Sequence, residues 1–170
     1  RGKKISDAEF CAPITAHYGH VDHVADRCDV LFLPVYLEKE TDGTDPSRLR
    51  KYCYYSALSS SIVAQRIEEK KKTIIMPVIN HRSGHTSVKK ELYASLKKVY
   101  PSLVSSFDAL SKNYDKALDD FISYKSRLRD LFVPPAKGEL AVALLGRPYT
   151  LLAKQMNKGI PDIFASLSVR

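Results

Sequence analysis

Three short runs of almost uninterrupted apolar residues constrain the fold of this 170-residue chain more than any other feature. The runs are DVLFLPVY at residues 29–36, TIIMPVI at 73–79 and LAVALL at 140–145. Strands that are apolar on both faces are typical of parallel sheets, which helices cover on both sides. Because Pro34 lacks an amide hydrogen, we expect the first strand to end there. The second run carries Pro77 just inside its carboxyl end.

Amphipathic segments separate and follow these runs. Apolar spacing of three or four residues predicts helices over residues 54–70, 87–100, 106–131, 151–158 and 160–169. The long helix at 106–131 has the clearest apolar stripe: Phe107, Leu110, Tyr114, Ala117, Phe121, Tyr124, Leu128 and Leu131. Ser105 with Asp108 could form its capping box. The alternation of strands and helices predicts an α/β fold with a parallel sheet, helices on both faces and right-handed crossovers.

We interpret residues 1–28 as an N-terminal motif segment and residues 29–170 as the parallel β/α core of a single domain or fragment. Ligands of such sheets bind beyond the carboxyl ends of the strands. This rule predicts that Val35–Tyr36, Asn80–His81 and Gly146–Arg147 share one edge of the sheet. His81 could hydrogen-bond an anionic ligand there, and Gly146 with Arg147 could bind a phosphate or carboxylate. Ordinary loop and turn residues are equally consistent with these patterns.

Composition excludes several classes of protein. A hydrophobic content of 44% with 27% charged residues argues against disorder. No apolar run reaches the roughly 20 residues of a membrane-spanning helix. The net charge of +8 is compatible with anionic partners, but the basic residues are scattered, which argues against nucleic-acid binding. Three cysteines do not make a secreted disulfide framework, so we expect a cytoplasmic protein without a membrane partner.

The cysteines are the first candidates for chemistry. Cys11 and Cys53 each precede a predicted helix, and a helix N-terminus favours a thiolate. They could be soft ligands of zinc or an iron–sulfur centre, or two unrelated buried thiols, because no C-x-x-C pair is present. Cys28, at the start of the first strand, is predicted to be a small core residue.

Three histidines in the segment HYGHVDH are a second candidate. His17 and His20 share a helical face, His23 is rotated away, and Gly19 argues against an unbroken helix. With Cys11 they could form a zinc site, although zinc sites use more closely spaced ligand pairs. Hydrogen-bonding histidines without a metal are the alternative.

Read together, four motifs point to a family. EFCAPITAHYGHVDHVADRCDVLFLPVYLE, KYCYYSALSSS, LLGRPYTLL and NKGIPDIFASLSV follow one another in this order and cover nearly the whole chain. The chain resembles the acyl-CoA dehydratase activase-related proteins, whose dehydratase-like region is akin to the subunits of 2-hydroxyacyl-CoA dehydratases.

The resemblance implies a Rossmann-like architecture that is an incomplete part of a larger multi-domain protein. It also implies a [4Fe–4S] cluster on three cysteines, reduced by an ATP-hydrolysing activator domain or subunit, and a CoA-thioester substrate. Cys11 and Cys53 match the first two cysteine positions of the family, and Cys28 matches none. His17 and His20 match histidines of unassigned role. No cysteine follows Cys53, so we expect a third ligand from beyond Arg170 and an incomplete or absent cluster in this fragment.

The leading hypothesis is therefore an iron–sulfur-binding domain in ATP-driven, low-potential electron transfer to a CoA-thioester type of reaction. We expect the isolated fragment to be inactive, and enzymatic activity belongs to a parent protein. Two alternatives stay open. One is a structural or docking module for activator domains that has no cluster. The other is an α/β domain that binds an anionic small molecule through Arg147. The sequence specifies neither the substrate nor the oligomeric state.

Overall fold

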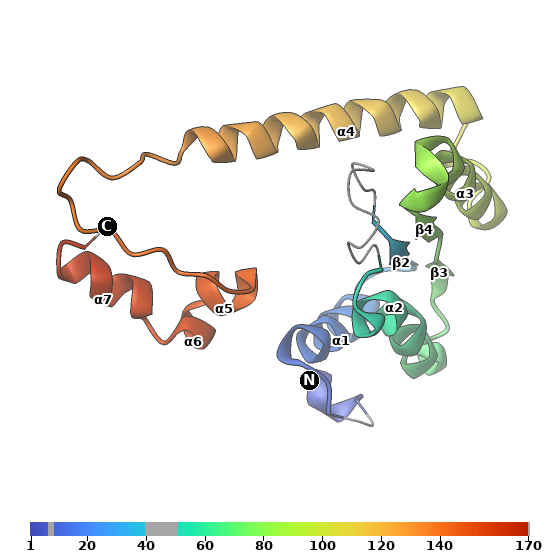
Figure 1. Cartoon of the computed structure of the whole chain (residues 1–170). Coiled ribbons are helices and arrows are strands. Elements are labelled where there is room, and N and C mark those ends of the chain that lie inside the picture. Colours follow the sequence, from blue (N-terminus) through green and yellow to red (C-terminus); the bar gives the residue numbers. More distant parts are fainter. Residues whose placement is uncertain (7–8, 40–50, 170) are drawn as a thin grey trace. The chain divides into compact units, whose positions relative to one another are not determined.

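The computed structural model describes residues 1–6, 9–39 and 51–169 (Figure 1). The chain divides into two compact units, Arg1–Leu118 and Asp119–Arg170. The first contains η1 (Gly2–Lys4), α1 (Ala12–Ala25), β1 (Val30–Phe32), β2 (Val35–Glu38), α2 (Tyr54–Arg66), η2 (Glu68–Lys70), β3 (Thr73–Ile75), β4 (Val78–Asn80), η3 (His81–Ser83) and α3 (Gly84–Val99). Helix α4 (Phe107–Asp130) begins in the first unit, and the second also holds α5 (Pro148–Leu152), α6 (Lys154–Asn157) and α7 (Ile160–Ser166).

Each of the first two apolar runs forms two strands that are separated by its proline. β1 pairs in parallel with β3, and β2 pairs in parallel with β4. The first strand ends at Pro34, as predicted, and a second strand that the sequence did not predict begins directly after it. The amide of Leu33 donates to the carbonyl of Ile75 (2.9 Å), and the amide of Val35 donates to that of Pro77 (2.9 Å). The neighbours of each proline thus continue the pairing that the proline amides cannot make.

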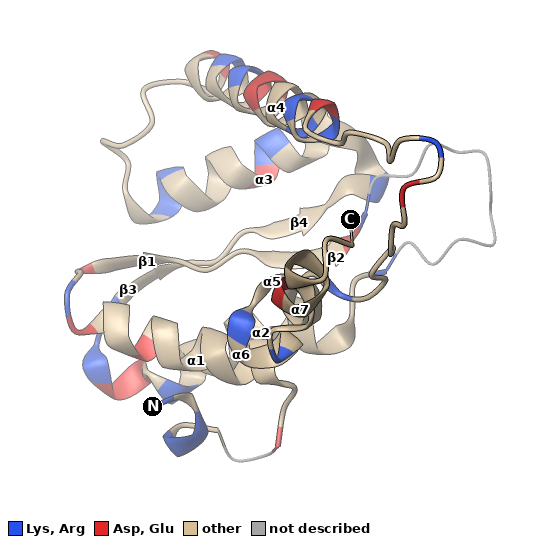
Figure 2. Ribbon diagram, turned by 90° about the vertical axis from the view of Figure 1, so that its left-hand side faces the viewer, with Lys and Arg blue, Asp and Glu red and all other residues tan. Residues whose placement is uncertain are grey.

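Helices cover both faces of these strands in the first unit, as predicted. Figure 2 shows α3 on one side of the strands and α1 with α2 on the other. The core on the α1 and α2 side consists of Ile14, Tyr18, Val21, Ala25, Leu31, Leu33, Val63 and Ile67. On α3, Val88 is buried. The parallel α/β pattern is confirmed at the level of strand pairs, whereas two-stranded pairs do not establish a Rossmann-like order.

The starts of α2, α3 and α4 lie close to the positions that the sequence pattern predicts, although α2 ends at Arg66, four residues earlier than predicted. α4 lies within one residue of the predicted bounds at each end, and α3 begins three residues earlier than predicted. Ser106, rather than Ser105, caps α4, because its hydroxyl accepts a hydrogen bond from the amide of Ala109 (3.1 Å). Among residues 1–6, 9–39 and 51–169, no helix combines the length and the hydrophobicity needed to cross a bilayer.

The prediction of a third buried strand at residues 140–145 is wrong. These residues form neither helix nor strand, and Leu140 and Leu145 are 68% and 92% exposed. A strand needs a neighbour to bond its amide and carbonyl groups, and the described residues of the second unit contain no other strand. The predicted helix at 151–158 is divided into α5 and α6, and the last helix is limited to α7.

Candidate functional site: two cysteines at neighbouring helix N-termini

Cys11 and Cys53 occupy equivalent positions in two helices. Cys11 is the N-cap residue of α1, and Cys53 is the N-cap residue of α2. The carbonyl of Cys11 accepts from the amide of Thr15 (3.1 Å), and the carbonyl of Cys53 accepts from the amide of Ala57 (2.9 Å). Neither side chain forms a capping hydrogen bond, and both thiols are free and exposed. Two thiol groups therefore stand at helix N-termini and are accessible from solvent.

An aromatic contact connects the two N-termini. The rings of Phe10 and Tyr55 meet edge to face with centroids 5.6 Å apart. Phe10 directly precedes Cys11, Tyr55 lies two residues after Cys53, and α1 packs against α2. The contact therefore places both cysteine-bearing N-termini at the same end of the helix pair. The first amides of each helix have no intrahelical acceptor, and the positive end of each helix dipole stabilises negative charge there.

The third cysteine has a different environment. Cys28 is half-buried and packs against the hydrophobic core, as predicted for a small core residue. It lies between the end of α1 and the start of β1. It therefore provides a natural control for experiments on Cys11 and Cys53.

The donor set can be compared with the needs of an iron–sulfur cluster. Exposed thiolates suit such clusters, whose four sites are normally filled by cysteines. Within the described ranges, no group of three or more His, Cys, Asp or Glu side chains is close enough to hold a metal ion. Cys11 and Cys53 therefore fit part of a cluster and do not complete one.

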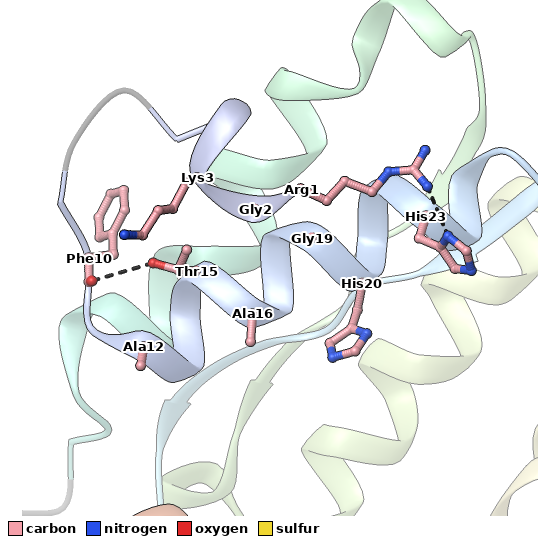
Figure 3. A pocket seen from close by; sticks show the side chains of 10 residues that line it. All are labelled: Arg1, Gly2, Lys3, Phe10, Ala12, Thr15, Ala16, Gly19, His20 and His23. Atoms are coloured by element: carbon pink, nitrogen blue, oxygen red, sulfur yellow. Dashed lines mark hydrogen bonds between the residues drawn. The ribbon is translucent and has the colours of Figure 1, made fainter. Parts of the chain in front are cut away.

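The histidine segment folds as part of one unbroken helix, contrary to prediction. α1 passes through Gly19 without interruption, and the glycine there serves packing. A Cβ atom at Gly19 would lie 2.8 Å from the amide nitrogen of Gly2, and one at Gly2 would lie 1.8 Å from the carbonyl oxygen of Thr15. The absence of both Cβ atoms lets η1 lie directly on α1 (Figure 3).

The three histidines make different contacts. His20 and His23 line an open groove of about 670 Å³ between η1 and α1 (Figure 3). The Nδ1 atom of His23 contacts the guanidinium of Arg1 (2.9 Å), and its Nε2 atom contacts Arg27. His17 is half-buried, and burial lowers its pKa, with a smaller contribution from His20. The contacts of His23 are those of an ordinary polar histidine, whereas the buried Nε2 atom of His17 has no hydrogen-bond partner among the described residues. The described residues do not gather the three histidines around one point.

An ion-pair network lies toward the other end of α1. The Nζ atom of Lys70 lies 2.6 Å from Oδ1 of Asp22, and the Nε atom of Arg1 lies 2.6 Å from Oδ2. Lys70 also pairs with Asp26 (2.7 Å). The hydrogen bond from Lys70 is the largest influence on Asp22 and, despite burial, holds the pKa of that carboxyl below its ordinary value. The network joins α1 to η2 and η1 and has no evident chemical role.

The carboxyl edge of the strands differs in detail from the prediction. β2 continues to Glu38, which lies opposite Asn80 at the end of β4, so the edge lies beyond Val35–Tyr36. His81 follows directly, and its buried Nδ1 atom has no hydrogen-bond partner among the described residues. The Oε2 atom of Glu38 is also buried and has no hydrogen-bond partner among the described residues. Sequence reasoning missed Glu38, although an acidic residue directly after an apolar strand is a recognisable signal.

Gly146 and Arg147 lie in the second unit, where Arg147 is the N-cap residue of α5. Its carbonyl accepts from the amide and the hydroxyl of Thr150 (2.9 and 2.7 Å). These contacts fit a turn that starts a helix. A ligand-binding role for Gly146, Arg147 and His81 stays a prediction.

Taken together, the first unit is a parallel α/β domain with a pair of exposed thiols at neighbouring helix N-termini. Over residues 1–170 the sequence matches the family described as CoA enzyme activase uncharacterised domain (DUF2229), and the chain belongs to this family. The match confirms the resemblance to acyl-CoA dehydratase activase-related proteins and links the chain to the activation of CoA enzymes. Comparison with curated proteins and comparison with solved structures gave no match.

Proposed function

We propose that this domain contributes Cys11 and Cys53 as two thiolate ligands to an iron–sulfur cluster that serves the activation of a CoA enzyme. One observation carries the proposal: two exposed, free thiols belong to the N-cap residues of neighbouring helices, whose N-termini are connected by the contact of Phe10 with Tyr55. The remaining ligands would come from outside the described residues, because these offer no third donor nearby.

The surroundings of the two thiols suit this role physically. Two helix N-termini direct unsatisfied amides and positive dipole ends toward the place where thiolate and sulfide charge would gather. Phe10 also contacts Tyr18 edge to face at 5.5 Å, and Tyr18 is fully buried in the core. The backbone that carries Cys11 is thereby attached to the hydrophobic core of the unit. Such anchoring holds a ligand in place before the cluster binds.

A bound cluster of this kind would supply low-potential, one-electron chemistry. We infer the partners from the family: an ATP-hydrolysing activator domain or subunit as electron donor, and a CoA-thioester reaction as its destination. The family description, which names CoA enzyme activation, supports this assignment.

The test is iron and acid-labile sulfide analysis of the protein purified anaerobically with the partners it retains. Cys11→Ser and Cys53→Ser should each lose most of the iron and sulfide of the wild type, because either loss leaves a single ligand in this domain. Cys28→Ser is the matched control and should keep the wild-type content. All variants are first checked for folding by circular dichroism. Equal iron in all four proteins, or a loss confined to Cys28→Ser, would show that the proposed ligands are wrong.

A further inference from the structure

The second half of helix α4 carries an apolar stripe that is exposed to solvent. Figure 1 shows α4 as one continuous helix, and its residues from Asp119 onward belong to the second compact unit. Phe121, Tyr124 and Leu128 are 57%, 51% and 48% exposed, and Leu131, directly after the helix, is 75% exposed. Large apolar side chains that line up on one helix face and meet water are typical of an interaction surface.

Helix α3 covers the first half of the same stripe. The ring of Phe107 meets that of Tyr93 edge to face, with centroids 5.8 Å apart. The hydroxyl of Tyr114 lies 2.7 Å from the Nδ1 atom of His85. Tyr93 and His85 both belong to α3. One stripe is therefore packed against a helix over its first half and exposed over its second half.

The spacing of the stripe is that of a coiled coil. From Phe107 to Leu131 the apolar positions alternate steps of three and four residues without a break, as the core positions a and d of a heptad repeat do. In this assignment Phe121 occupies position a and Tyr124 position d. Ile122 is equally exposed but occupies position b, which faces away from the seam. The exposed stripe is therefore shaped to receive another helix.

The charges along this half of α4 make it complementary to itself in the reverse direction. Two aspartates, Asp119 and Asp120, lie at its start, and three basic residues lie toward its end: Lys125, Arg127 and Arg129. In an antiparallel coiled coil, a positions face d positions and g positions face g positions. When Phe121 faces Tyr124 of a second copy, this geometry places Asp120 beside Arg127 of that copy. The twofold symmetry of such a dimer repeats the ion pair on the other side.

We propose that α4 pairs with α4 of a second copy of this chain as an antiparallel coiled coil. A parallel pair would gather the arginines of both copies at one end and align the two helix dipoles, both of which are unfavourable. The parallel arrangement would also place Lys125 beside Asp120, yet the Nζ atom of Lys125 already lies 5.5 Å from the ring centroid of Phe121 on its own helix. The proposal does not depend on an iron–sulfur cluster.

Sedimentation equilibrium of the 170-residue chain under reducing conditions tests the pairing. We expect a weak dimer, because about two heptads bury less than the roughly 1,200 Å² of a standard interface, so the series extends to about 1 mM. Phe121→Glu places a charge in the seam and should weaken the dimer at least about tenfold. Ile122→Glu is the matched control and should dimerise as the wild type does. A chain that stays monomeric throughout, or equal weakening by both substitutions, would overturn the proposal.

Exchange of the paired charges tests the antiparallel direction. Asp120→Arg and Arg127→Asp each place like charges side by side, so each should weaken the dimer at least about threefold. The double variant Asp120→Arg/Arg127→Asp restores opposite charges and should recover the wild-type affinity. In a parallel pair it would stay weak, because the introduced arginine would face Lys125. A double variant no stronger than Asp120→Arg, with the helix content of the wild type by circular dichroism, would contradict the antiparallel pairing.

Discussion

At the scale of single residues, accessibility divides the three thiols of this chain into two groups. Cys11 and Cys53 are exposed at helix N-termini, whereas Cys28 is half-buried against the core. We expect iodoacetamide to label Cys11 and Cys53 in the folded, metal-free chain at least about tenfold faster than Cys28. In urea all three should react at similar rates. Peptide mass spectrometry after timed quenching measures the rates, and three equal rates in the folded chain would contradict the described exposure.

The ion pairs of Asp22 predict a pH-dependent contribution to stability. Lys70 lowers the pKa of this carboxyl, so the stabilisation is present above the ordinary aspartate value of about 3.9 and is lost as the pH falls below it. Asp22→Asn should lower the free energy of unfolding by about 1–3 kcal/mol at pH 7, and the difference from wild type should shrink by pH 3.

Urea unfolding at pH 7 and pH 3 measures this effect. Asp29→Asn is the control, because Asp29 is exposed and should change stability by less than about 0.5 kcal/mol. A difference between wild type and Asp22→Asn that is the same at both pH values would rule out the ion pairs as its cause.

At the scale of elements, the contact of η1 with α1 depends on two glycines. Alanine is favoured over glycine in a helix by about 1 kcal/mol, yet a Cβ atom at Gly19 would meet the backbone of Gly2. We therefore expect Gly19→Ala to gain nothing in melting temperature and to increase hydrogen exchange in η1. Ala16→Gly, one turn before Gly19 on α1, should lose stability without exposing η1. A more stable Gly19→Ala protein with η1 still protected would show that the close approach is not restrictive.

The sequence predicts an element well when the residues of that element alone determine it, and poorly when the element needs a partner from elsewhere in the chain. α4 was predicted to within one residue at each end, because its eight apolar positions repeat without a break. The run at 140–145 does not form the predicted strand, because apolarity alone does not show whether a partner strand is available. The placement of Cys11 and Cys53 directly before helices agrees with the prediction. The unpartnered side-chain oxygen of Glu38 could not be predicted from the sequence, because its burial depends on how neighbouring elements pack.

At the scale of the whole molecule, burial is concentrated in the first unit. The buried apolar side chains that the structure describes all lie between Ile14 and Val104. The segment from Phe132 to Arg147 in the second unit has no helix or strand. Among the trypsin sites of the described residues, we expect Lys137 to be cut first, because local opening there breaks little structure. Time-resolved mass spectrometry of the fragments measures this order, and earlier cleavage within α3 would contradict it.

Thiol protection in the iron-loaded protein tests the central claim most directly, since it identifies individual ligands without mutation. The anaerobically isolated protein is treated with iodoacetamide before its iron is removed and again afterwards. The iron is removed by a chelator under oxidising conditions, and the thiols are then reduced again and the reductant is removed before labelling. Each cysteine is quantified by peptide mass spectrometry. The account predicts that Cys11 and Cys53 are protected together while iron is bound and become reactive together once it is removed, with Cys28 unchanged. Labelling of Cys11 and Cys53 at the same rate with and without iron would contradict it.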